Sequence, residues 1–458
     1  MTLVKSISGM RGTIGGEPGE GLTPVDLLKF LSGFAGMLRA TKNNPTVVIG
    51  RDGRSSGEAI LAYSIGILRL CGCHVINLDL STTPTVEMAV PFHEADGGII
   101  LTASHNPREW NALKFLNERG EFISADYGEK LLGLSQIGPV SYPSNEHIGS
   151  LRNDDESLNR HIEAILTLPY IPVQKIRERR FKVVVDAINS TGSLAIPPLL
   201  NELGVEYDIL NDTIDGNFAH NPEPLPLHLE DLKHAVRSTN ADLGIAVDPD
   251  VDRLALFGPR GKYFGEEYTL VAVADHVLER TPGPTVSNLS STKALGDLSK
   301  KYAVPHHQSA VGEVNVVQLM KETQAVIGGE GNGGVILPEL HYGRDALAGI
   351  GLILGLLAER NTDLNTLKES YTTYHMVKDK MPLEANLHAD DIIVLITDAY
   401  KNSHEVSTID GVKINFEEGW VHLRKSNTEP IIRLYAEGKT KVSARSYIKE
   451  IKNMIFNI

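Results

Sequence analysis

Three aspartates at alternate positions, Asp248, Asp250 and Asp252, stand in the stretch DPDVDR between the apolar runs GIAV and LALF. Such runs are typical of strands, so the three carboxylates would meet at the end of a sheet. Crowded carboxylates repel one another unless a cation lies between them. The loop is not an EF-hand, because Arg253 and Pro259 stand where that loop needs Gly and Glu. The spacing predicts a divalent-cation site rather than a solvated acidic turn, and favours Mg²⁺ over Ca²⁺ because no bidentate glutamate follows nearby.

A second polar loop, Ser104-His105-Asn106-Pro107, follows the apolar run GGIILT and precedes Lys114. A hydroxyl beside an imidazole could act as a nucleophile with a proton carrier. A serine after a strand is more often a helix N-cap than a nucleophile, and a helix could start in the stretch NPREWNALKF. His105 could be a structural histidine. The pair therefore points to catalysis only in combination with the aspartate loop and Lys114.

The segment LRKSNTEPIIR, residues 423–433, combines guanidiniums, hydroxyls and an amide on a turn between two expected strands. These groups, with successive backbone N–H donors, favour a clamp for a dianion such as phosphate. The alternative is an ordinary Asx-type turn with solvated arginines. The candidate ligands are Arg424, Ser426, Asn427, Thr428 and Arg433.

The segment VIGGEGNGG is rich in glycine but matches neither a P-loop nor a dinucleotide-binding fingerprint. Its Glu330 and Asn332 suit the hydroxyls of a sugar better than phosphates. Two further stretches, SGMRGTIGG with Arg11 and GRDGR at 50–54, add cations in glycine-rich settings. Each of those arginines could also be an ordinary loop residue.

The elements that must position these loops follow one pattern three times. Strand, helix, strand, helix and strand alternate over 46–102, 181–247 and 285–329, and each polar loop follows the third strand of its unit. Ligands in open α/β sheets gather at the carboxyl ends of strands. We therefore predict an α/β protein of three related βαβαβ-type domains and a smaller C-terminal α+β domain. The expected segments are 1–150 with the serine loop, 151–258 with the aspartate loop, 259–370 with the glycine-rich loop and 371–458 with the arginine turn.

Composition limits the classes of partner. The chain has 458 residues, 41% of them hydrophobic and 22% charged, and a net charge of −14 that argues against binding nucleic acid. No apolar run reaches the roughly 20 residues that span a bilayer, and the first residues do not resemble a signal peptide. Cys71 and Cys73, the only cysteines, form neither a disulfide framework nor a zinc site. We expect a cytoplasmic protein without a membrane partner.

Taken in order, TASHNP with Lys114 after it, DPDVDR, GGEGNGG and RKSNTEPIIR resemble the motifs of the alpha-D-phosphohexomutase superfamily. This superfamily includes phosphoglucomutases, phosphomannomutases and phosphoglucosamine mutases, and the likeness extends from Arg11 to Arg433. It implies four domains around a central cleft and an isomerase that moves phosphate between the 1- and 6-positions of a hexose phosphate. It also implies a hexose 1,6-bisphosphate as intermediate and activator, a small phosphosugar as the partner, and a monomer or homodimer.

The resemblance also implies roles for individual residues. Ser104 would carry the phosphate, and Asp248, Asp250 and Asp252 would hold Mg²⁺ together with it. Glu330 and Asn332 would bind sugar hydroxyls, and the arginine turn would bind the phosphate that is not reacting. The remaining catalytic candidates are Lys114 and Arg11 for the attacking and leaving oxygens, Arg253 for the phosphoryl charge and His105 for a proton.

The sequence departs from the common family pattern in the third loop. Where many members read GE-x-SGH, Asn332 replaces the serine and Gly334 the histidine, so that histidine's role does not transfer. The lysine motif has Asn111-Ala112 in place of Asn-Gly. VGEVNV with GEGNGG favours glucosamine phosphate, whereas SNTEP leans toward mannose or glucose phosphates. We expect a phosphoglucosamine mutase, with a phosphomannomutase or phosphoglucomutase as the alternative.

Two other classes of protein share part of this pattern. A metal-dependent phosphomonoesterase also uses a serine and aspartates, but it would not need the distant clamp. A non-catalytic phosphosugar-binding protein would keep the clamp and could dispense with Ser104.

Overall fold

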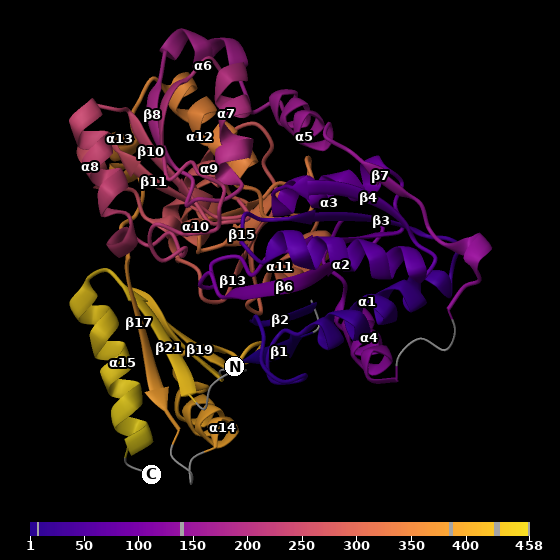
Figure 1. The fold of residues 1–458 in the computed structure, drawn as a ribbon. Coiled ribbons are helices and arrows are strands. Elements are labelled where there is room, and N and C mark those ends of the chain that lie inside the picture. The colour runs from indigo at the N-terminus through magenta and orange to yellow at the C-terminus, as the bar shows by residue number, and fades with distance from the viewer. Residues whose placement is uncertain (7–8, 138–141, 384–387, 426–430, 457–458) are drawn as a thin grey trace. The chain divides into compact units, whose positions relative to one another are not determined.

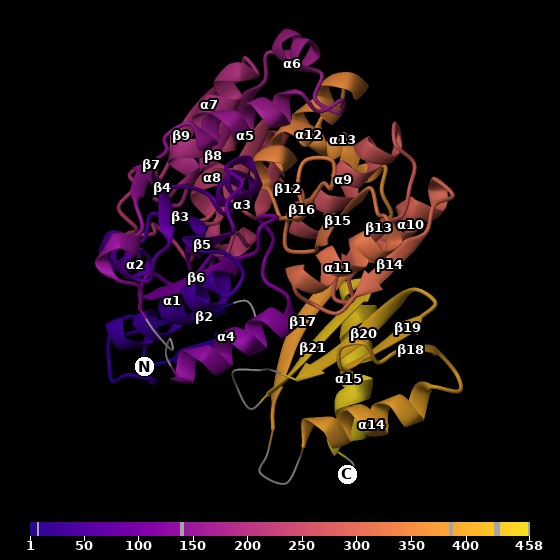
Figure 2. The same cartoon turned by 90° about the vertical axis from the view of Figure 1, so that its right-hand side faces the viewer.

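The structure, a computed structural model, describes residues 1–6, 9–137, 142–383, 388–425 and 431–456. The chain forms two compact units, drawn as ribbons in Figure 1 and Figure 2. Unit 1 comprises Met1–Thr269 and Gly334–Asn365, and unit 2 comprises Leu270–Gly333 and Thr366–Ile458, so the chain passes between the units three times. Within the described ranges, no helix is both long enough and apolar enough to cross a bilayer.

The N-terminal part of unit 1 is a sheet of seven strands covered by helices. Its spatial order is β1-β2-β6-β5-β3-β4-β7, with β5, β3, β4 and β7 parallel and the β6, β2 and β1 pairings antiparallel. The strands are β1 (Leu3–Ser6), β2 (Gly9–Thr13), β3 (Thr46–Arg51), β4 (His74–Leu80), β5 (Gly97–Leu101), β6 (Trp110–Leu116) and β7 (Leu151–Asn153). The helices are α1 (Pro24–Arg39), α2 (Gly57–Leu70), α3 (Thr83–Phe92) and α4 (Ala125–Ile137). The alternation predicted over 46–102 is confirmed.

The stretch after Asn106 is a strand, so the helix start considered for it was wrong. The N–H of Trp110 donates to the carbonyl of Pro107 over 3.0 Å, closing a turn that sends β6 back along β5. In this pairing Lys114 lies opposite Ile100. Pairing with a neighbouring strand decides the conformation here, which local residue preferences do not reveal.

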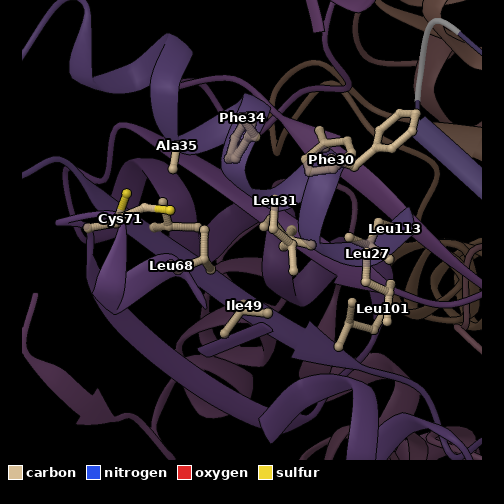
Figure 3. Packing of buried hydrophobic residues seen from close by; sticks show 14 of the residues in the cluster. Leu27, Phe30, Leu31, Phe34, Ala35, Ile49, Leu68, Cys71, Leu101 and Leu113 are labelled. Carbon is tan, nitrogen blue, oxygen red and sulfur yellow. The ribbon is translucent and has the colours of Figure 1, made fainter. Parts of the chain in front are cut away.

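One hydrophobic core of unit 1 lies between α1, α2 and the sheet (Figure 3). Helix α1 begins sharply because the Thr23 side chain accepts the Asp26 N–H and Pro24 occupies the first turn. The core residues drawn in Figure 3 include Leu27, Phe30, Leu31 and Phe34 of α1, Leu68 of α2, Cys71, Ile49 of β3, Leu101 of β5 and Leu113 of β6. Both cysteines are free thiols in the interior. This core fixes the strand ends that carry the serine loop.

The second part of unit 1 contains a five-stranded sheet in the order β12-β11-β10-β8-β9. Its strands are β8 (Lys182–Asp186), β9 (Glu206–Leu210), β10 (Leu243–Val247), β11 (Leu254–Gly258) and β12 (Lys262–Tyr263). Helices α5 (Ser157–Leu166), α6 (Val173–Arg179), α7 (Gly192–Glu202) and α8 (Glu230–Thr239) belong to it. Strand β16 (Gly334–Ile336) and helix α12 (Ala346–Arg360) come from far along the chain, yet α12 contacts α5, α6 and α7. Figure 1 shows α12 in orange beside the magenta α6 and α7.

Unit 2 contains a parallel sheet and an antiparallel one. In the first, β13 (Thr285–Asn288) lies between β14 (His306–Ser309) and β15 (Ile327–Glu330), with α10 (Ala294–Lys301) and α11 (Glu313–Thr323). The second has the order β17-β21-β20-β19-β18, formed by β17 (His375–Pro382), β18 (Glu405–Ser407), β19 (Val412–Phe416), β20 (Gly419–Lys425) and β21 (Ile431–Gly438). Helices α14 (Ala389–Tyr400) and α15 (Lys441–Phe456) share one core with that sheet, which confirms the α+β prediction.

Two remaining helices, α9 (Glu266–Leu278) and α13 (Leu364–Glu369), run across points where the chain passes between the units. The segment boundaries expected near residues 150, 258 and 370 stay predictions.

Candidate active site

Ser104 follows β5 in a strained backbone conformation. Its φ of 47° lies in the left-handed region, which is uncommon for a residue other than glycine and is often found at functional sites. The Ser104 N–H donates to Thr102 Oγ1 over 2.9 Å, and the Ser104 hydroxyl donates to Asp248 Oδ2 over 2.7 Å. The serine loop and the aspartate loop, 144 residues apart in the chain, therefore meet directly.

Arg54 organises the serine loop. Its side chain is fully buried, and Nε donates to Asp52 Oδ2 over 3.0 Å. The two terminal nitrogens donate to backbone carbonyls of the loop, at 2.5 to 2.9 Å, those of Ser104, Asn106, Pro107 and Trp110. From the sequence alone, the arginines of GRDGR are only possible loop cations. The glycine-flanked setting gave no signal that Arg54 would be buried beneath the serine.

The three aspartates lie together as predicted. Asp248, Asp250 and Asp252 are each 0% exposed, and one oxygen from each lies within 4.8 Å of the others. The N–H groups of Asp252 and Arg253 donate to Asp248 Oδ1, both over 3.1 Å. This tight turn places Val251 at a φ of 61°, which is strained for a β-branched residue.

The free oxygens of this cluster fit a hard cation. Asp250 Oδ1 and Asp252 Oδ1 are buried and have no hydrogen-bond partner among the residues that the structure describes. A buried carboxylate oxygen without a hydrogen bond is costly, and Mg²⁺ prefers such oxygens as ligands. Burial, together with repulsion from Asp252 and Asp250, raises the pKa of Asp248 well above its usual range. The oxygen donors and the two atoms without hydrogen bonds both favour a divalent cation here.

Cationic and hydroxyl groups donate to the other carboxylate oxygens of Asp250 and Asp252. Lys114 Nζ and the Thr83 hydroxyl both donate to Asp250 Oδ2, over 2.9 Å and 2.7 Å. Burial alone would raise the pKa of Asp250, but the Lys114 charge and these hydrogen bonds hold it below its ordinary value. Arg344 donates to Asp252 Oδ2 over 2.6 Å. Thr83 and Arg344 were missed, because nothing near them in the sequence indicates a partner more than 90 residues away.

Two other predicted residues lie around the same loops. Arg253 Nε lies 3.9 Å from carboxylate oxygens of both Asp248 and Asp252. His105 Nδ1 lies 3.4 Å from Ser104 Oγ, and burial with repulsion from nearby arginines, Arg253 first, lowers the pKa of His105 well below its usual value. The imidazole is therefore neutral at neutral pH and can accept a proton.

Arg11 lies on the neighbouring strand to Lys114. It pairs with Ala112 of β6, two residues before Lys114, so both cationic side chains leave the same face of the sheet. Arg11 is also one of the arginines whose charge lowers the pKa of His105. The sequence-predicted residues of unit 1 are thus brought together: Arg11, Ser104, His105, Lys114, Asp248, Asp250, Asp252 and Arg253.

The glycine-rich loop belongs to unit 2 and holds Glu330 in a fixed position at the end of β15. Asn288 Nδ2 and the Gly312 N–H donate to Glu330 Oε1, over 2.8 Å and 3.1 Å. Asn332 Nδ2 lies 3.4 Å from Glu330 Oε2. Because two donors fix the orientation of this carboxylate, it can accept hydrogen bonds from a hydroxyl or ammonium group in a defined direction.

The arginine turn joins β20 and β21, also in unit 2. Arg424 and Arg433 occupy directly opposed positions on these strands, and Lys380 of β17 is opposed to Arg433. Opposed residues project from the same face, so three cations form one row across the sheet. Asp410 Oδ2 lies 2.7 Å from Arg424 Nε. Such a row is unfavourable by itself and favours an anionic ligand; Ser426, Asn427 and Thr428 lie outside the described residues.

Family models of the phosphoglucomutase/phosphomannomutase proteins match nearly the whole chain. The alpha/beta/alpha domains I, II and III match residues 4–135, 159–261 and 265–374, and the C-terminal domain matches residues 377–454. The chain belongs to this family. It is therefore a member of the alpha-D-phosphohexomutase superfamily and an isomerase, with three α/β domains and a smaller C-terminal domain.

Individual relatives agree over their full length. A phosphoglucomutase/phosphomannomutase of Thermococcus kodakarensis is 35% identical, with 96% of each chain covered. A probable phosphoglucosamine mutase of Methanopyrus kandleri is 32% identical, with 98% of this chain and 96% of the relative covered. The crystal structure of a phosphoglucomutase/phosphomannomutase family protein from Burkholderia thailandensis has a TM-score of 0.84 at 26% identity, covering 98% of this chain and 97% of that one. Phosphohexomutase activity follows from this family membership.

Proposed function

We propose that this phosphohexomutase converts glucosamine 6-phosphate and glucosamine 1-phosphate into each other through a phosphoserine at Ser104. The observation that carries the proposal is the 2.7 Å hydrogen bond from the Ser104 hydroxyl to Asp248, inside a buried cluster of three aspartates. It supports the proposal because the oxygen that would carry the phosphate lies beside the carboxylates that would hold a divalent cation. The phosphomonoesterase and the non-catalytic binding protein are less favoured, because the relatives are mutases.

In the first transfer, the O–P bond of phosphoserine 104 breaks as a new O–P bond forms to the free hydroxyl of the sugar phosphate. The hydroxyl proton passes to a base, and we assign this role to His105 because its Nδ1 lies 3.4 Å from Ser104 Oγ. The product is a hexose 1,6-bisphosphate, which turns and returns its other phosphate to Ser104. Lys114, Arg11 and Arg253 would stabilise the charge on the attacking, leaving and phosphoryl oxygens.

Asp248, Asp250 and Asp252 would hold Mg²⁺, which when bound would neutralise charge on the phosphoryl oxygens. The two carboxylate oxygens without hydrogen bonds support that assignment. A trace of hexose 1,6-bisphosphate would also act as activator, since it rephosphorylates any enzyme that has lost its phosphate.

The preference for an amino sugar rests on Glu330. The Gly312 N–H, in the segment VGEVNV, donates to Glu330 Oε1 in the segment GEGNGG, so the two stretches that favoured glucosamine phosphate act on one carboxylate. An ionised carboxylate binds an ammonium group more strongly than a hydroxyl. The names of the relatives divide between glucosamine and glucose or mannose phosphates, so the latter two sugars are the alternative substrates.

Two measurements test the proposal. Intact mass should show a stable phosphate on the wild-type protein that is absent from Ser104→Ala, and this variant should lose roughly three orders of magnitude or more in turnover while its circular dichroism is unchanged. Near-normal mutase activity of Ser104→Ala would overturn the mechanism. Products limited to inorganic phosphate would favour the esterase.

The second measurement compares kcat/KM for the 1-phosphates of glucosamine, mannose and glucose, with Mg²⁺ and a trace of bisphosphate. We expect the highest value for glucosamine 1-phosphate, and a selective loss of that preference in Glu330→Gln. A higher value for mannose or glucose would establish the alternative. The cytoplasmic location, the absence of nucleic-acid and membrane partners, and a monomeric or homodimeric state stay predictions.

A further inference from the structure

Four ionisable side chains of unit 1 lie together outside the serine and aspartate loops, three of them buried and His341 partly buried. Glu87 comes from α3, His161 from α5, His341 from the loop before α12, and Asp345 from the N-cap of α12. Glu87 and His161 are 1% exposed and Asp345 is 2% exposed. The proposed phosphoryl transfer uses none of these four residues. We call them the His161–Asp345 cluster.

Two imidazoles of the cluster converge on one carboxylate oxygen. His161 Nε2 lies 2.8 Å and His341 Nε2 lies 3.2 Å from Asp345 Oδ2, and the three atoms lie within 4.8 Å of one another. Ligand atoms about 2.0–2.1 Å from a tetrahedral Zn²⁺ are roughly 3.3 Å apart. The three atoms therefore need to separate only slightly to surround such an ion.

The other nitrogen of each imidazole lies near a polar side chain. His161 Nδ1 is hydrogen-bonded to the Thr85 hydroxyl over 3.0 Å, and His341 Nδ1 lies 3.5 Å from Glu87 Oε2. Metal-binding histidines characteristically have their second nitrogen hydrogen-bonded, as His161 has here, which fixes the ring and its tautomer. Gly343 leaves the space that the Glu87 carboxylate occupies, since a Cβ at that position would collide with Oε2.

Charge balance also points to a divalent cation. Glu87 and Asp345 bring two carboxylates into the interior, where unbalanced charge is costly. Two protonated imidazoles would neutralise them, and so would one divalent cation bound to two neutral imidazoles. In the second arrangement His161 Nε2 and His341 Nε2 would direct electron pairs at the cation, together with Asp345 Oδ2.

A cavity adjoins one residue of the cluster. It has a volume of about 380 Å³, lies between α3 and α5, and is lined by His161 together with Met88, Phe92 and Arg160.

We propose that His161, His341 and Asp345 form a second cation site, which binds Zn²⁺ or another nitrogen-preferring transition metal and is separate from the aspartate site. Imidazole ligands select such metals over Mg²⁺, whereas the all-oxygen set of Asp248, Asp250 and Asp252 selects Mg²⁺. Glu87 orients His341 without binding the metal itself.

Hydrogen bonds connect the elements that carry the His161–Asp345 cluster to the aspartate loop. Arg344, next to Asp345, donates to Asp252, and the Ala346 N–H at the start of α12 donates to the carbonyl of Val251 over 3.2 Å. Thr83, at the start of the helix that carries Glu87, donates to Asp250. A metal in the cluster would therefore tie α3, α5 and α12 together behind the aspartates.

The test is equilibrium dialysis of the full-length protein against Zn²⁺ in excess Mg²⁺, followed by elemental analysis. We expect one equivalent of zinc on the wild type, at least a tenfold loss of zinc affinity in His161→Gln and His341→Gln, and retention of that equivalent when all three aspartates of the aspartate site are changed to Asn. The matched control is His93→Gln, which removes another histidine paired with an aspartate at 2.8 Å and should keep the zinc. Co²⁺ should give the visible absorption of a tetrahedral site only where zinc binds.

Folding of each variant is checked by circular dichroism. If a histidine variant does not fold, Asp345→Asn serves instead, because its amide oxygen can still accept the Ala348 N–H that caps α12. The proposal is overturned if the wild type binds no zinc, or if zinc is lost with the aspartates and kept by His341→Gln. These outcomes leave the mutase proposal standing, because they do not involve Ser104.

Discussion

The guanidinium of Arg54 donates to the carbonyl oxygen of Ser104 itself, over 2.5 Å, and the neighbouring nitrogen binds two further carbonyls of the same loop. Two contacts therefore fix Ser104: Arg54 donates to its backbone carbonyl, and its hydroxyl donates to Asp248. The strained φ of Ser104 persists because both sets of contacts determine it.

We expect Arg54→Lys to lower turnover about 100-fold, because a small displacement of a reacting oxygen has effects of that size. A lysine cannot replace five directed donors, so buried carbonyls would lose their partners and the free energy of unfolding would fall by about 3–5 kcal/mol. Steady-state kinetics and denaturant unfolding measure both effects.

The control for this prediction is Arg51→Lys in the same GRDGR motif. Arg51 pairs at 2.8 Å with Asp79, whose side chain is 60% exposed. The free energy of unfolding of Arg51→Lys should differ from that of the wild type by no more than about 0.5 kcal/mol. Equal effects of the two substitutions would show that Arg54 has no special role in the serine loop.

Mg²⁺ binding to the metal-free, unphosphorylated protein should release a proton from Asp248. The pKa of this carboxyl is raised by burial and by its aspartate neighbours, so it is protonated over a wider pH range than an ordinary aspartate, and the cation binds the deprotonated form. The release should diminish as pH rises above that pKa. Titration calorimetry in two buffers of different ionisation enthalpy measures it, and Asp248→Asn should abolish it. Identical heats in both buffers would contradict the prediction.

Lys380 should contribute to phosphate binding although no motif includes it. It continues the row of Arg433 and Arg424 across β17, β21 and β20. Because Lys380 is exposed, we expect Lys380→Ala to raise KM about two- to fivefold with kcat nearly unchanged. The matched control is Lys378→Ala on the same face of the same strand, where the ammonium lies 5.8 Å from the Tyr435 ring centroid. A rise in KM of the same size for Lys378→Ala would indicate a general charge effect rather than a clamp.

His220 should make stability depend on pH. Burial opposes protonation, but the hydrogen bond and charge of Asp186, at 2.9 Å, raise the pKa of His220 above its ordinary value. A raised folded-state pKa stabilises the protein fully below the unfolded-state pKa of about 6.5, and that stabilisation disappears as pH rises through the folded-state pKa. The melting temperature of the wild type should therefore exceed that of His220→Gln by more at pH 6 than at pH 9. A pH-independent difference would exclude this ion pair.

The sequence was sufficient for the alternation of strands and helices over 46–102, which follows from hydrophobic periodicity. The meeting of Ser104 with the aspartates was expected from the family resemblance alone, because β5 and β10 belong to different sheets. The aspartate cluster was predictable because its three ligands lie within five residues, so no long-range contact had to be inferred.

The residues that surround those ligands could not be predicted in the same way. Arg54, Thr83 and Arg344 are ordinary residues in the sequence, and only the packing of distant elements buries them against the serine and aspartate loops. His161 and His341 are 180 residues apart and belong to no motif. The strand β6 was missed because its pairing with β5, rather than its own composition, determines its conformation.

Unit 1 is interrupted in the chain by residues 270–333, and this has a consequence during synthesis on the ribosome. A nascent chain that has emerged only to residue 333 contains all three aspartates but lacks Arg344 and the helix that follows it. At synthesis rates of about 5–20 residues per second, several seconds pass between the synthesis of Asp252 and that of Arg344, which binds it. We expect a chaperone or protease that surveys nascent chains to encounter this half-finished unit before the enzyme can be completed.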